Sequence, residues 1–124
     1  NDTLYAGDGG NNVLIGGAGA DIMYGGAGND SFRFTSLKDL GLNELQDVIH
    51  SFTRGEDQLD FTTLKGWRFM GVGEGAAATD TKQLWAEQDG SDLIVYGNSG
   101  GSLGADFSIK LVGLSNLSVE DFSF

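Results

Sequence analysis

The sequence predicts an all-β protein in which a right-handed parallel β-roll is capped at its C-terminal end by an antiparallel β-sheet. A glycine-rich pattern repeats every nine residues near the N-terminus, and the chain has 21 glycines but no proline. Further along, residues 83–96 place two apolar stretches around Asp89-Gly90, a pair that is preferred in tight hairpin turns. We assign residues 1–34 to the roll and residues 35–124 to a β capping region of the same domain.

The repeat is clearest in two adjacent nonapeptides, residues 16–24 and 25–33. Both match G-G-x-G-x-D-x-U-x, where U is a large apolar residue. Residues 7–15 form a degenerate copy with Asn12 in place of the aspartate, and residues 1–5 form the tail of a fourth copy. Glycine at fixed intervals indicates a turn with repeated positive φ angles. The alternative, a glycine-rich region with incidental aspartates, does not account for two complete adjacent copies.

The last three positions of each copy predict a short strand whose central side chain points inward. This inward row consists of Leu4, Leu14, Met23 and Phe32. One nonapeptide makes half a coil, so each copy stacks on the copy two positions away. We therefore expect Asp2 to lie near Asp21, and Asn12 to lie near Asp30.

Stacked turns of this composition predict cation sites between neighbouring coils. An aspartate oxygen from each of two coils, with backbone carbonyl oxygens of the turns, gives about six hard oxygen ligands, and we expect about two such sites. This ligand set suits Ca²⁺ better than Mg²⁺. Without the ion, two carboxylates about 4 Å apart repel by roughly 4 kcal/mol at an effective dielectric constant near 20. The candidate ligands in the repeats are Asp2, Gly7, Gly9, Asn12, Gly16, Ala18, Asp21, Gly25, Ala27 and Asp30.

Charge and composition argue against several functions. The net charge of −11 disfavours nucleic acid and anionic membranes as partners and favours cations. The absence of cysteine removes disulfides and cysteine-based metal or redox sites. No apolar run approaches the roughly 18 residues of a membrane-spanning helix, so we expect no membrane insertion. His50 is the only histidine and the serines lack a base partner, so we expect no enzyme activity.

The segment after the repeats resembles a known family. Residues 47–60 are similar to the pattern D-x-I-x-D-F-x-x-G-x-D-x-I-D, which follows the repeats of RTX (repeats-in-toxin) calcium-binding domains such as the C-terminal domain of serralysin-type metalloproteases. The resemblance adds Asp47 and Asp57 to the candidate calcium ligands. Ser51 departs from the pattern, because the family usually has aspartate there, and this departure implies that one site is weakened or missing.

The resemblance extends over nearly the whole chain, because residues 104–114 and 117–124 are similar to the closing strands of the same domains. It implies a non-catalytic module of an extracellular enzyme or adhesin. Such a module folds on binding calcium outside the cell and supports secretion through a type I secretion apparatus, so we expect a secreted, extracellular location. No signal peptide is visible and the chain opens inside a repeat, so we expect a fragment of a longer protein.

A second function stays open because the outward positions of the roll carry aromatic and basic side chains. Tyr5 and Tyr24 lie on one predicted sheet face and Arg33 on the other. The aromatic rings could stack on sugar rings, and Arg33, Arg54, Lys65 and Arg68 could contact an anionic polysaccharide. RTX modules similar to this chain occur in alginate epimerases. The competing interpretation is that both tyrosines pack beneath the C-terminal strands, and the net charge of −11 favours it.

Overall fold

The computed structural model describes residues 1–73, 81–100 and 104–124. In chain order, its strands are β1 (Thr3–Tyr5), β2 (Val13–Leu14), β3 (Ile22–Tyr24), β4 (Ser31–Arg33), β5 (Asp47–His50), β6 (Gln58–Asp60), β7 (Arg68–Val72), β8 (Gln83–Asp89), β9 (Asp92–Asn98), β10 (Phe107–Leu111) and β11 (Phe122–Ser123). Short 3₁₀ turns form at η1 (Leu37–Asp39), η2 (Asn43–Leu45) and η4 (Val119–Asp121). In the described part of the chain, no helical segment is long and apolar enough to cross a membrane.

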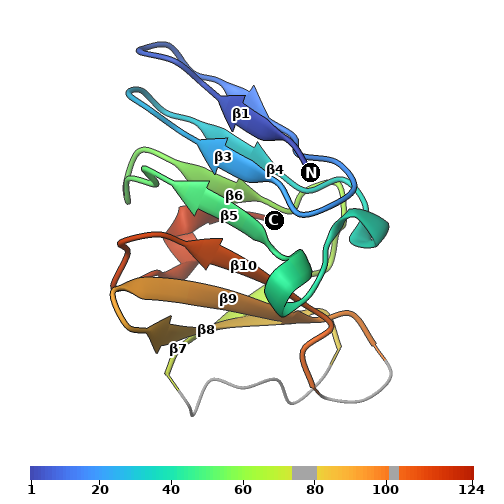
Figure 1. The fold of residues 1–124 in the computed structure, drawn as a ribbon. Helices are drawn as coiled ribbons and strands as arrows, with labels where there is room; N and C mark the ends of the chain where they lie inside the picture. The colour runs from blue at the N-terminus through green and yellow to red at the C-terminus, as the bar shows by residue number, and fades with distance from the viewer. Residues whose placement is uncertain (74–80, 101–103) are drawn as a thin grey trace.

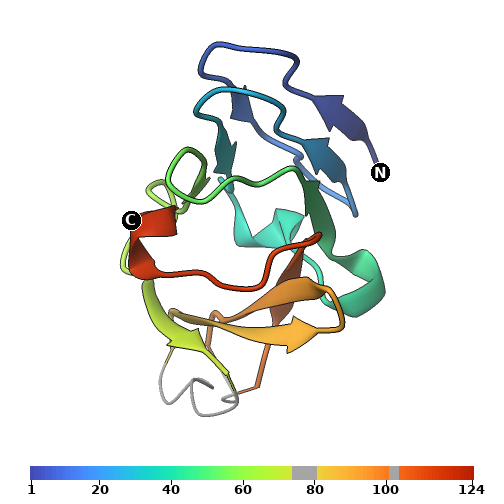
Figure 2. The ribbon, with the colours of Figure 1, turned by 90° about the vertical axis from the view of Figure 1, so that its left-hand side faces the viewer.

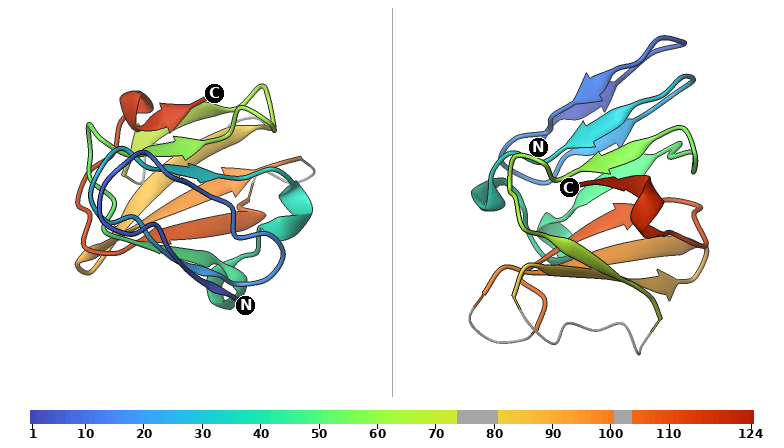
Figure 3. Two further views of the ribbon diagram at one scale, coloured as in Figure 1. Left: turned by 90° about the horizontal axis from the view of Figure 1, so that it is seen from above. Right: turned by 180° about the vertical axis from the view of Figure 1, so that it is seen from behind.

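The strands form two sheets that enclose one core. The larger sheet has the order β1-β3-β5-β10-β9-β8-β7 and the smaller one the order β2-β4-β6-β11. Figure 1 shows the larger sheet running from β1 at the top of the molecule to β7 at the bottom, and Figure 3 shows the two sheets from above. Successive strands of the chain alternate between the sheets through β6, so two strands make one coil.

The coils stack in register, and this places the apolar residues in continuous rows. Leu4 pairs with Met23 in the larger sheet, and Leu14 pairs with Phe32 in the smaller one. Met23 and Phe32 are almost completely buried, Leu14 is buried, and Leu4 is partly buried against them. The predicted inward row is therefore confirmed. Each fully buried side chain of this kind contributes about 1.5–3 kcal/mol to stability.

Parallel stacking continues beyond residue 34, where the glycine-rich repeats end. β5 pairs in parallel with β3, and β6 pairs in parallel with β4. The reason is visible in the sequence, because residues 47–49 and 57–59 keep the D-x-U end of the nonapeptide, while the turns before them are longer and lack the repeated glycine pattern. Residues 35–60 thus add a third coil on longer turns, below the glycine-rich turns in Figure 2.

The antiparallel cap extends the larger sheet of the roll. β10 pairs in parallel with β5 and antiparallel with β9, which forms a hairpin with β8. Asp89 pairs with Asp92, so the two-residue turn is Gly90-Ser91, one position later than the sequence predicted. On the other side, β11 pairs in parallel with β6 and completes the smaller sheet (Figure 3). The predicted all-β architecture, a parallel roll with an antiparallel cap, is confirmed.

Candidate metal centre

On the side of the larger sheet, hydrogen bonds link the aspartates at the start of β1, β3 and β5 from one coil to the next. Asp21 Oδ1 accepts a hydrogen bond from the backbone N–H of Asp2 at 2.7 Å. One coil further on, Asp47 Oδ1 accepts one from the backbone N–H of Asp21 at 2.9 Å. The structure therefore brings Asp2, Asp21 and Asp47 together in one column.

The residues that precede β2, β4 and β6 repeat this arrangement on the side of the smaller sheet. Asp30 Oδ1 accepts hydrogen bonds from the backbone N–H and the side-chain amide of Asn12, both at 3.1 Å. Asp57 Oδ1 accepts one from the backbone N–H of Asp30 at 2.9 Å. The expected proximity of Asn12 to Asp30 is thus confirmed, and Asp57 lies one coil below them.

Two of these aspartates keep a buried oxygen without a partner. Asp21 is 0% exposed and Asp30 is 1% exposed. Within the described residues, Oδ2 of each forms no hydrogen bond. A buried ionised oxygen of this kind carries a large desolvation cost unless a cation or a donor reaches it. These two oxygens are the strongest structural sign of a ligand that binds between the coils.

The glycine-rich turns lie directly against these oxygens. A Cβ atom added to Gly16 would lie 2.7 Å from Asp21 Oδ2, and one added to Gly25 would lie 3.4 Å from Asp30 Oδ2. On the side of the smaller sheet, turn 25–30 also contacts turn 7–12, since a Cβ on Gly26 would collide with the carbonyl oxygen of Gly7. Glycine is thus needed here for close approach as well as for positive φ.

Other predicted ligands occupy the same stacked turns. The N–H of Gly9 donates to the carbonyl oxygen of Ala27 at 3.3 Å, which joins turn 7–12 to turn 25–30. Ala18 holds the equivalent position of turn 16–21. Most of the repeat residues predicted as ligands therefore lie where two turns meet.

Asp47 and Asp57 differ from Asp21 and Asp30 in their surroundings. Burial raises the pKa of Asp47 to about 7, and the negative charges of Asp21 and Asp39 add to the effect against an opposing hydrogen bond from the Asp21 backbone. The sequence analysis did not predict the effect of Asp39 on Asp47, because Asp39 lies outside the repeat pattern.

Asp57 is bonded at both oxygens, because Oδ2 also accepts the backbone N–H of Thr53 at 2.7 Å. Burial raises its pKa as well. Asp57 is satisfied without an ion, whereas Asp21 and Asp30 are not.

The donor set fits Ca²⁺. In the part of the chain that the structure describes, no three His, Cys, Asp or Glu side chains come close enough to hold a metal between them. Any ion between the coils therefore takes one or two carboxylates and completes its shell with backbone carbonyl oxygens and water. Ca²⁺ accepts such irregular oxygen shells, while Zn²⁺ prefers nitrogen and sulfur ligands in tetrahedral geometry.

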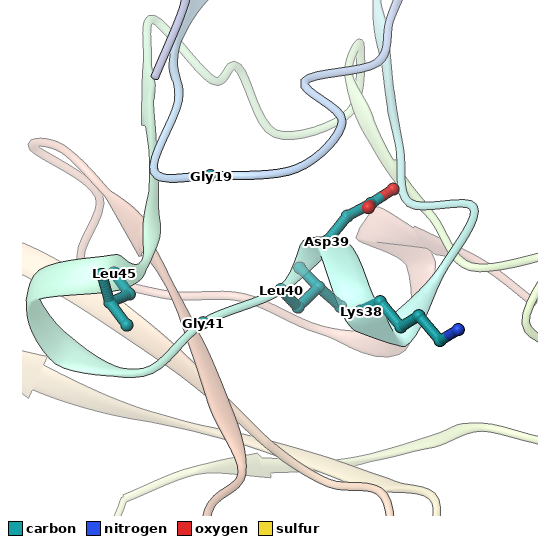
Figure 4. A pocket seen from close by; sticks show the side chains of 6 residues that line it. All are labelled: Gly19, Lys38, Asp39, Leu40, Gly41 and Leu45. Atoms are coloured by element: carbon teal, nitrogen blue, oxygen red, sulfur yellow. The ribbon is translucent and has the colours of Figure 1, made fainter.

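A hollow of about 160 Å³ lies beside turn 16–21. It is lined by Gly19, Lys38, Asp39, Leu40, Gly41 and Leu45. Figure 4 shows the Gly19 backbone above it and the Asp39 carboxylate projecting toward the upper side. Its charged lining consists of Lys38 and Asp39, one cation and one carboxylate, with no nucleophile paired to a base.

The predicted carbohydrate contacts lie in different settings. Tyr5, Tyr24 and His50 form a stack along the larger sheet, with ring centroids 4.6 and 4.5 Å apart and nearly parallel planes. Tyr5 is 71% exposed, so the expectation that it packs beneath the C-terminal strands is wrong. The reason is that β1 is the edge strand, and the strands of the cap lie beyond β5. Arg33 is bound to Asp60 at 2.9 Å.

Comparison with known proteins identifies the family. The family model described as Peptidase M10 serralysin C terminal matches residues 7–124. The chain belongs to this family. The predicted relationship to RTX-type serralysin C-terminal domains is therefore confirmed. A comparison with curated protein sequences found no match to the chain.

Two solved structures similar to this chain are subunits of an epimerase. One is the solution structure of the AlgE6R3 subunit of the Azotobacter vinelandii mannuronan C5-epimerase, with 30% identity, a TM-score of 0.65, and coverage of 98% of this chain and 67% of that one. Another is the AlgE6R2 subunit of the same epimerase, with 27% identity, a TM-score of 0.68, and coverage of 98% and 86%. The fold is thus shared by modules of a peptidase family and of a polysaccharide epimerase.

Proposed function

We propose that this domain is a non-catalytic module that binds Ca²⁺ between its stacked turns and folds when the ion binds. The buried, unpartnered Oδ2 atoms of Asp21 and Asp30 carry this proposal. Ca²⁺ would neutralise these carboxylates and join each of them to the carbonyl oxygens of the adjacent turn. In the absence of the ion, carboxylate desolvation and the entropy of ordering so many glycines oppose formation of the roll.

The Ca²⁺ concentration is low in the cytosol and high outside the cell, and this difference would restrict folding of the domain to the outside. Extracellular calcium modules bind with dissociation constants on the order of 10⁻⁴ to 10⁻³ M, far above the cytosolic level. The chain would stay unfolded in the cytosol, pass through a type I secretion apparatus, and fold outside as an accessory module of a secreted enzyme or adhesin. Each occupied site would add about 1–2 kcal/mol of stability at roughly tenfold excess of ion over its dissociation constant.

Circular dichroism tests the proposal directly. The β signal and the thermal transition should be weak in EDTA and should appear on titration to about 5 mM Ca²⁺, with a midpoint between micromolar and millimolar concentrations. The same concentration of Mg²⁺, which keeps its water shell more strongly, serves as the control and should restore much less structure. An equal signal in EDTA and in Ca²⁺ would falsify calcium-driven folding.

A second candidate function is the binding of an acidic polysaccharide, and the likeness to two subunits of a mannuronan epimerase favours it. The aromatic stack limits how sugars could bind, because both faces of Tyr24 are covered by neighbouring rings and the open ring face is that of Tyr5. Arg33 is already engaged by Asp60. Calorimetric titration of the Ca²⁺-loaded domain with oligomannuronate should give saturable heat, and its absence would remove this candidate.

A further inference from the structure

The basic residues of this acidic chain fall into two groups. Arg33, Arg54 and Lys110 form ion pairs with Asp60, Asp121 and Asp92, at 2.9, 2.9 and 3.4 Å. These three cations are therefore used to hold the fold together. Within the described residues, the other four basic side chains, Lys38, Lys65, Arg68 and Lys82, form no ion pair.

Three of the four unpaired cations gather at one place. Lys65 and Arg68 flank the short segment that leads into β7, and the N–H of Arg68 donates to the carbonyl oxygen of Lys82 at 3.0 Å. The Lys82 side chain lies over Gly66, with Nζ 3.5 Å from the position of a Cβ atom on that glycine. All three cationic residues are exposed. We call Lys65, Arg68 and Lys82 the cationic patch.

The backbone at the cationic patch is unfavourable for its residues. Lys65 has a φ of 48° and Lys82 a φ of 57°, in the left-handed region that favours glycine and asparagine. A lysine in this conformation costs about 1 kcal/mol or more relative to glycine. Three like charges close together add further repulsion. Strain and unrelieved charge at the same surface are features of a binding site more than of a stabilising one.

We propose that the cationic patch is the site at which this domain binds an acidic polysaccharide. This inference rests on the second candidate function and locates it on the cap, away from the aromatic stack. The patch lies at the β7 edge of the larger sheet, and Tyr5 lies on β1 at the opposite edge. With a net charge of −11, most of the surface repels a polyanion, so a carboxylated chain can approach favourably only where unpaired cations are concentrated.

The experiment is a calorimetric titration of the Ca²⁺-loaded domain with oligomannuronate at low and moderate salt. The triple variant Lys65→Gln/Arg68→Gln/Lys82→Gln should bind at least about tenfold more weakly and should lose most of the salt dependence. Lys38→Gln, which removes an unpaired cation outside the patch, is the control and should bind as the wild type does. Tyr5→Ala, at the opposite edge, tests the aromatic stack as the alternative site. Because the triple variant removes mutually repelling charges and leaves the backbone conformation unchanged, its thermal transition in Ca²⁺ should not fall.

Each outcome decides between the proposals. Wild-type binding that the triple variant retains, or that Tyr5→Ala abolishes, would overturn the patch as the site and leave polysaccharide binding intact. No binding by the wild type would overturn both the cationic patch as the site and polysaccharide binding as a function. Equal binding of poly-glutamate would show a docking site for acidic protein segments and would also overturn the polysaccharide assignment. Circular dichroism of every variant in Ca²⁺ keeps these outcomes separate from failure of calcium-driven folding.

Discussion

The backbone N–H of Asp30 donates to the carboxylate of Asp57, while Asp30 itself keeps a buried oxygen with no partner in the described residues. The two aspartates occupy equivalent positions of consecutive coils. Asp57 is fully bonded, because its second oxygen accepts the N–H of Thr53. Equivalent positions in the repeat thus have different roles. Asp30 offers a carboxylate oxygen to an ion, whereas Asp57 accepts hydrogen bonds from the backbone.

This difference predicts distinct effects of two alanine substitutions. Asp30→Ala should raise the Ca²⁺ midpoint of folding by about tenfold, equivalent to about 1.4 kcal/mol of lost binding free energy. Asp57→Ala should raise it less and should instead lower the thermal transition at saturating Ca²⁺, because two backbone N–H groups lose their acceptor. Calcium titrations followed by circular dichroism check both, and a larger midpoint shift for Asp57→Ala would contradict the site assignment.

A second prediction concerns pH in the absence of Ca²⁺. Burial raises the pKa of Asp47 from 3.8 to about 7, so the folded state favours the protonated carboxyl. The resulting destabilisation is fully present above pH 7 and is relieved as the pH falls toward 3.8. The raised pKa of Asp57 acts in the same direction. The lowered pKa of Asp60 acts in the opposite direction, mainly below its usual value of 3.8.

In EDTA, the domain should therefore be more folded near pH 5 than near pH 8, as measured by circular dichroism or ANS fluorescence. Asp47→Asn, which cannot ionise, should reduce the difference between the two pH values. In Ca²⁺ the trend should reverse, because protons compete with the ion for the same carboxylates. A pH dependence in EDTA that Asp47→Asn leaves unchanged would show that another group is responsible.

A third prediction separates backbone strain from turn-to-turn contact at matched glycines. Gly17 and Gly26 hold the same position of consecutive repeats, with φ of 79° and 82°. A Cβ on Gly17 meets nothing within 4 Å, whereas a Cβ on Gly26 collides with the carbonyl oxygen of Gly7. Gly17→Ala should cost about 1–2 kcal/mol through strain alone. Gly26→Ala should cost clearly more and should raise the Ca²⁺ midpoint, and equal losses would argue against close packing of the turns.

A fourth prediction tests whether the C-terminal strand supports the roll. Phe122 is buried, packs 4.6 Å from the Phe69 ring, and lies on β11 beside β6 of the third coil. Phe122→Ala should cost about 3–5 kcal/mol and should raise the Ca²⁺ midpoint, because the coils above lose their base. Val119→Ala, an exposed position of the same segment, should change neither quantity. A lower melting temperature with an unchanged midpoint would mean that cap and roll fold independently.

The repeat and the stacking of the coils can be predicted from the amino-acid sequence alone. Positive φ at fixed glycines and one apolar residue per strand leave few other folds open, and the proximities of Asp2 to Asp21 and of Asn12 to Asp30 follow from two strands per coil. The D-x-U ends of residues 47–49 and 57–59 also carried the signal of a third coil. The turns before them lack the repeated glycine pattern, so the repeat by itself predicts a roll that ends at residue 34.

The roles of the aspartates and of the basic residues depend on tertiary contacts that the sequence pattern does not reveal. Whether an aspartate oxygen is left unpartnered depends on which backbone N–H groups the next coil presents, as the contrast between Asp30 and Asp57 shows. The pairing of Arg33 with Asp60 and the grouping of Lys65 with Lys82 likewise depend on contacts between segments far apart in the chain. Local pattern sets the coil, because turn and strand geometry are local, while charge pairing and desolvation are set by neighbours that only folding brings together.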